Sequence, residues 1–176
     1  MNNRLKVQKV IRSVITDAMT ALGYSGWSIQ EFASPDFVSL DKAVLMNLVR
    51  TERLGWQSNS TYVTGSGPKR KDEWLELEHW QLHIIAKRPK NADENTVVAE
   101  DVTAELVAYL NGPGMDAFRR NGIAPERIDG QTVLVYNDDN EIFQKRGVFT
   151  VKIQVPKELI TGETLLESIK PGIVPV

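Results

Sequence analysis

The sequence predicts an α+β fold, a mainly antiparallel sheet packed against an N-terminal helix and a central helical pair, with an extended C-terminal tail. Apolar residues recur with a 3.6-residue period in the first 22 residues and over residues 98–110, which indicates helices. Residues 149–155 instead alternate apolar and polar side chains, which indicates a half-buried strand. The order of helix, strands, helices and hairpin favours antiparallel pairing. We therefore assign residues 1–156 to a single domain and residues 157–176 to the tail.

The composition of the 176-residue chain is that of an ordinary globular protein. With 41% hydrophobic and 25% charged residues it can build a core, and its formal net charge of −2 provides no global basic field for nucleic acid. The absence of cysteine excludes disulfides, thiolate metal sites and a cysteine nucleophile. No signal peptide and no membrane span can be recognised, so we expect the protein to fold in the cytoplasm.

The first helix is the clearest element of the sequence. Gly23 follows its last periodic residue and can adopt the left-handed conformation that ends a helix. We expect this helix to pack on the core through the apolar residues of one face: Val7, Val10, Ile11, Val14, Ile15, Ala18, Met19 and Leu22.

Two strands and a long connection are expected next. Residues 43–50 are almost continuously apolar, so they form either a buried strand or a helix between Asp41 and Gly55, and we favour the strand. Residues 54–68 are rich in Gly, Ser, Asn and Thr, which predicts a long loop. A second strand is expected over residues 73–86, and the basic cluster Lys69, Arg70 and Lys71 is expected in a mobile loop before it.

The central helical pair follows this second strand. Asp93 or Asn95 can cap the first of the two helices, which ends at residues 111–113, Asn-Gly-Pro. The second is short, over residues 115–120, and Asn121-Gly122 closes it.

A hairpin and the tail complete the chain. We expect the hairpin to consist of a strand over residues 132–136, a turn at residues 137–140 and the alternating strand over residues 149–155. Pro156 ends the second strand. In the tail, Pro171 and Pro175 prevent regular structure beyond residue 170. Its apolar residues have no element of their own to pack in.

No constellation of catalytic, cofactor-binding or metal-binding residues can be recognised. His79 and His83, the only histidines, could share a metal on a helix, but on a strand they lie about 13 Å apart. The glycines around Ser66 do not have Walker spacing, and no GxSxG elbow is present. We therefore expect no enzyme activity, no cofactor and no metal.

Three groups of residues are candidates for protein interfaces. An aromatic residue in a loop can anchor a partner, and so can a basic cluster or an apolar tail. The candidates are Trp56, the cluster Lys69, Arg70 and Lys71, and the tail residues Leu165, Leu166, Ile169, Ile173 and Val174.

Taken in order, residues 42–155 resemble the tail terminator or neck proteins of long-tailed bacteriophages, especially contractile-tailed ones. The resemblance is carried by four features of the sequence. They are Arg50 and Arg53 with Gly55-Trp56-Gln57, the Glu-rich strand over residues 76–81, Gly122-Ile123, and the final strand after Phe143.

The resemblance implies a structural virion protein of the tail or neck, assembled in the host cytoplasm. It implies a hexameric ring that caps the tail tube, joins it to the head connector and leaves a lumen for DNA. Its partners would be tail tube, sheath and connector proteins, with no membrane and no sequence-specific nucleic acid. The alternative function is a small cytoplasmic binding adaptor or an enzyme with an unrecognised site.

Overall fold

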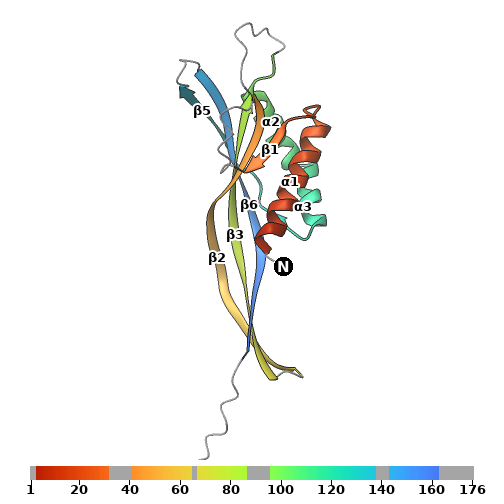
Figure 1. The fold of residues 1–176 in the computed structure, drawn as a ribbon, viewed down its shortest axis with the longest axis vertical. Helices are drawn as coiled ribbons and strands as arrows, with labels where there is room; N and C mark the ends of the chain where they lie inside the picture. The colour runs from red at the N-terminus through yellow and green to blue at the C-terminus, as the bar shows by residue number, and fades with distance from the viewer. Residues whose placement is uncertain (1–2, 32–40, 65–66, 87–95, 138–142, 163–176) are drawn as a thin grey trace, which may run out of the picture.

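The computed structural model describes residues 3–31, 41–64, 67–86, 96–137 and 143–162. It confirms an α+β fold with a mostly antiparallel sheet, an N-terminal helix and two further helices (Figure 1). The elements in chain order are α1 (Asn3–Ala21), β1 (Ser28–Glu31), β2 (Lys42–Thr64), β3 (Gly67–Ala86), α2 (Ala99–Leu110), α3 (Pro113–Arg120), β4 (Ala124–Pro125), β5 (Gln131–Asn137) and β6 (Phe143–Gly162). None of these helices is long and apolar enough to cross a membrane.

Three long strands, β2, β3 and β6, determine the shape of the molecule. The sheet order is β1-β2-β3-β6-β4, β5 also pairs with β6, and every pair is antiparallel except β1 with β2. Figure 1 shows the helices over one part of the sheet, while β2, β3 and β6 continue well beyond them. We call this helix-free continuation the arm: residues 54–64 of β2, 67–75 of β3 and 156–162 of β6.

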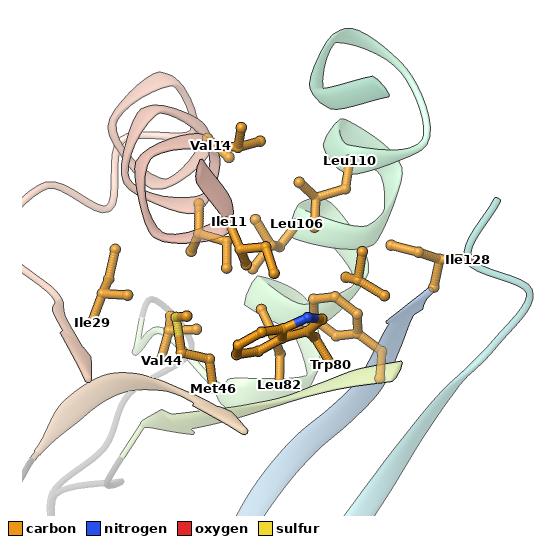
Figure 2. Close-up of a cluster of buried hydrophobic side chains, with 14 of the residues drawn as sticks. Ile11, Val14, Ile29, Val44, Met46, Trp80, Leu82, Leu106, Leu110 and Ile128 are labelled. Atoms are coloured by element: carbon orange, nitrogen blue, oxygen red, sulfur yellow. The ribbon is translucent and has the colours of Figure 1, made fainter. Parts of the chain in front are cut away.

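The core lies where α1 and α2 pack against the sheet (Figure 2). Every second residue of β3 faces the helices, so Trp80, Leu82 and Ile84 enter this core. Ile11 of α1 and Leu106 of α2 meet them and are fully buried. Each such side chain contributes roughly 1.5–3 kcal/mol by leaving water, which is why the amphipathic helix patterns predicted these elements correctly.

Several boundaries agree with the sequence prediction. Helix α1 ends before Gly23, whose φ of 85° is the expected left-handed conformation. Residues 43–50 are strand, not helix, and β5 pairs with β6 as the predicted hairpin. Helix α2 ends at Leu110, where the Asn111 side chain donates to the Ile128 carbonyl (3.0 Å) and accepts from the Ile128 N–H (2.8 Å).

The predicted start of α2 is too early. The helix begins at Ala99 after Val98, whose side chain makes no capping hydrogen bond. Asp93 and Asn95, the expected caps, lie outside the described residues. Helix α3 begins two residues before the predicted position because Pro113 occupies its first turn, where a missing N–H costs nothing.

The predicted loop over residues 54–68 is wrong. Strand β2 runs to Thr64 and β3 begins at Gly67, so almost all of this segment is strand. Its Ser, Asn and Thr residues gave no apolar alternation because both faces of the arm are solvated, and the backbone ladder to β3 maintains the extended conformation instead.

The predicted end of the last strand at Pro156 is also wrong, since β6 continues through Gly162. Pro156 pairs with Leu75 of β3, while β4 reaches only Ile153 and Gln154 on the other side of β6. Proline is tolerated in an edge strand where the missing N–H would face away from the neighbouring strand. The short strands β1 and β4 were not predicted.

Helix α2 approaches the sheet so closely at Gly147 that no side chain fits there. A Cβ built on this β6 residue would lie 2.7 Å from the Cβ of Thr103, a buried residue whose hydroxyl donates to the Ala99 carbonyl (2.6 Å). We expect Gly147→Ala to lower the free energy of unfolding by about 3 kcal/mol, near the top of the range for overpacking. Urea denaturation measures the loss. Gly130→Ala, where a Cβ meets open space, is the control, and a similar loss in both variants would contradict the close approach.

Candidate interaction surfaces

The two histidines lie in β3 as predicted, but each ring has its own partner. His79 Nε2 lies 2.9 Å from Glu52 Oε1, and His83 Nε2 lies 3.0 Å from Gln81 Oε1. Burial, and then the positive charge of Arg146, lowers the pKa of His83, so its imidazole is neutral at pH 7. Within the described ranges no group of three or more His, Asp or Glu side chains could hold a metal ion.

A polar network joins the arm to the core. Glu78 is 1% exposed and both of its carboxylate oxygens are used: Oε1 accepts from Lys157 Nζ (2.8 Å) and Oε2 accepts from Trp80 Nε1 (3.0 Å). Lys157 Nζ also lies 3.6 Å from Glu76 Oε2, and Glu76 Oε1 accepts from Trp74 Nε1 (2.8 Å). A buried carboxylate is tolerated only with such complete pairing.

The network continues onto β2 at a bulge. The Arg53 guanidinium lies 4.8 Å from the centre of the Trp74 ring and Arg53 Nη1 donates to Gln57 Oε1 (3.1 Å). The pairing of β2 with β3 shifts between Leu54 and Ser58, and Gly55 there has a φ of 67°. This irregularity leaves three residues out of the ladder.

Trp56 lies at the centre of this bulge and is 98% exposed. Its predicted position in a loop is therefore wrong, because it belongs to β2. The bulge holds the side chain in solvent, away from the core of its own domain. Its role as an interface anchor stays a prediction.

The basic cluster lies in β3 and not in a mobile loop. Lys71 Nζ contacts Glu73 Oε1 (2.6 Å) and Glu158 Oε2 (3.4 Å), and Arg70 Nε contacts Asp72 Oδ1 (3.0 Å). The hydrogen bond to Glu73 is the main cause of a raised pKa of Lys71. Because Arg70 and Lys71 are paired with acids of the arm, the cluster that they form with Lys69 is not an isolated positive patch. Their role in an interface is untested.

Apart from Trp56, the apolar side chains exposed on the arm form a surface that sequence reasoning missed. These side chains occur on all three strands of the arm, where Asp72 is the only buried residue among those described. Exposed apolar residues gathered on one part of a protein mark interaction sites. They are Trp56, Tyr62, Val63, Leu75, Leu159 and Ile160. The tail candidates Leu165, Leu166, Ile169, Ile173 and Val174 lie outside the described residues.

Glu78 supplies the test of the network. In Glu78→Gln the amide nitrogen must face Lys157 or Trp80, both of which are donors. We expect the free energy of unfolding to fall by about 2–4 kcal/mol, less than for a wholly buried pair because Glu76 remains near Lys157. Asp116→Asn, which removes the exposed pair with Arg119, should cost about 0.5 kcal/mol or less. Equal losses in urea denaturation would show that the network does not stabilise the protein.

Comparison with known proteins gives one informative match. No curated protein matches the chain. The family model described as "E217 gateway protein gp29" matches residues 6–163, from α1 to the end of the arm. The match agrees with the phage structural class that the resemblance implied, whereas tail terminator and contractile tail stay predictions. Because the model covers far more than half of the sequence, the chain belongs to the family of the phage gateway protein gp29 of E217.

Proposed function

We propose that this protein is a structural subunit of the bacteriophage neck, which assembles into a closed ring of six copies. In this role, as a tail terminator, the ring caps the tail tube and joins it to the head connector. The family supports a structural role in the virion, and its name, gateway protein, fits a ring through which DNA passes. Tube, sheath and connector proteins are the proposed partners.

The arm is the observation that carries this proposal. Three strands without a helical cover expose apolar side chains on both faces, although a ribbon of this kind buries little surface of its own. The Glu78 network holds the arm in a fixed direction relative to the core. A subunit that must contact several neighbours needs such a projecting surface, and it needs no reaction site.

A ring follows if the contacts between copies are heterologous. The arm lies at one end of the molecule and the helices at the other, so the two ends offer different surfaces (Figure 1). Heterologous contacts whose rotation closes produce rings. The lumen of such a ring would pass DNA without reading its sequence.

Mass measurement together with negative-stain images tests the ring. The purified protein, alone or on tail tubes, should form closed rings of six subunits. The double variant Trp56→Ala/Val63→Ser, which changes residues 98% and 81% exposed, should assemble at least tenfold less well while its unfolding midpoint is unchanged. The matched control is Leu5→Ala, an exposed residue of α1. A protein that is monomeric in solution and in virions would contradict the proposal.

The tail provides a second test. We propose that residues 163–176 dock on a neighbouring chain, since their leucines, isoleucines and valines favour burial. Deleting them leaves β6 complete to Gly162, whereas a cut after Glu158 would remove part of the strand. The deletion should leave the unfolding midpoint nearly unchanged and weaken assembly. A monomer that unfolds or aggregates after the deletion would show that the tail belongs to its own core.

A further inference from the structure

The arm has two strand edges without a partner strand in the described part of the chain. Strand β1 pairs only with residues 43–46 of β2, so no strand among the described residues pairs with the outer edge of β2 from residue 47 to residue 63. Strand β4 pairs only with Ile153 and Gln154 of β6, so the outer edge of β6 has no partner strand in the described ranges from residue 155 to residue 162. The central strand β3 is paired on both sides along the arm.

The outer part of both edges has none of the usual protection against strand pairing. Exposed edges are normally blocked by lysine, proline or a bulge. Residues 58–64 of β2 contain no charged residue and no proline, and neither do residues 159–162 of β6. Pro156, Lys157 and Glu158 protect only the preceding part of β6. The two unprotected segments lie at the same level of the arm, because Thr61 and Thr161 both pair with Arg70.

The two segments also expose apolar side chains on the same faces of the arm. Ser60, Lys71 and Ile160 lie side by side on one face of the arm, so Tyr62, two residues from Ser60, shares that face with Ile160. By the same reasoning Val63 shares the opposite face with Leu159. Tyr62, Val63, Leu159 and Ile160 are 37%, 81%, 51% and 48% exposed. Each edge therefore presents one apolar side chain on each face.

We propose that residues 58–64 of β2 in one copy hydrogen-bond with residues 159–162 of β6 in the next copy, so that neighbouring arms form one continuous sheet. This inference rests on the proposed ring. Because β2 and β6 run parallel to each other, a register that places Tyr62 opposite Ile160 of the neighbour places Thr61 opposite its Leu159. Val63 then lies diagonally across from Leu159 on the other face of the sheet. Pairing would also give hydrogen-bond partners to the outward backbone groups of residues 58–63 and 159–162.

Strand direction favours this head-to-tail pairing over a symmetric one. Strands β2 and β6 both run antiparallel to β3, so they run parallel to each other. A copy rotated about an axis along the arm keeps its strand direction and can place its β6 beside β2 of its neighbour. Pairing of β2 with β2 would be isologous, would end at a dimer and would leave both β6 edges open.

Disulfide trapping is well suited to this chain because it contains no cysteine. Within one copy, Ser60 and Ile160 flank Lys71, so their Cα atoms are two strand spacings apart, about 9.5 Å. This separation exceeds the roughly 7 Å limit for a disulfide. Neighbouring strands lie about 4.8 Å apart, so only a contact between copies can link these positions.

The experiment mixes two single variants of the full chain, one of which has an affinity tag, and oxidises them mildly under assembly conditions. Tyr62→Cys mixed with Ile160→Cys, or Ser60→Cys with Ile160→Cys if the register is shifted by two residues, should give a reducible mixed dimer. Its yield should be at least tenfold that of either variant alone. Arg12→Cys, exposed on α1, mixed with Ile160→Cys is the control.

The other outcomes separate this inference from the proposed function. Rings without the mixed disulfide in either register would overturn the edge pairing and leave the ring intact. Ser60→Cys linking efficiently to itself would show isologous β2 pairing and would also overturn it. A protein that neither forms rings nor cross-links would contradict both proposals.

Discussion

The paired carboxylate of Glu78 determines how the two halves of this molecule are connected. On one side it accepts from the indole of Trp80, which belongs to the apolar core, and on the other it accepts from Lys157, which belongs to the arm. An uncompensated charge at this level of burial would cost several kcal/mol. Glu78 therefore adds a side-chain link between the arm and the core to the link that the three continuous strands already provide.

The sequence predicts the parts of the fold that depend on local amphipathicity. Helix α1, the helical pair and the hairpin each bury one face, so their periods are visible in the residues themselves. The arm has no buried face, and its Ser- and Thr-rich strand therefore resembled a loop. Strands β1 and β4 have four and two residues, too few to show a period, and depend on partners elsewhere in the chain.

The candidate surfaces were predicted less completely than the fold. Trp56 was selected correctly as a residue without a place in the core, but its bulge could not be foreseen because Gly55 is one of many glycines. The Glu78 network had a signal that was overlooked. Trp74, Glu76, Glu78 and Trp80 recur at every second position of one strand, and an indole N–H beside a carboxylate on the same face is a natural hydrogen bond.

The pairing of β3 has a consequence for the order of events during synthesis. Its partner β2 precedes it directly, so this hairpin of the arm can form early on the ribosome. Its other partner, β6, is the last described element of the chain, and Lys69 pairs with Gly162. The third strand of the arm can therefore be added only after residues 143–162 have been synthesised, because long-range strand pairing must wait for the later residues. A nascent chain consequently lacks one side of its arm until β6 has emerged, so the β6 edge that we propose to pair with another copy does not exist before then.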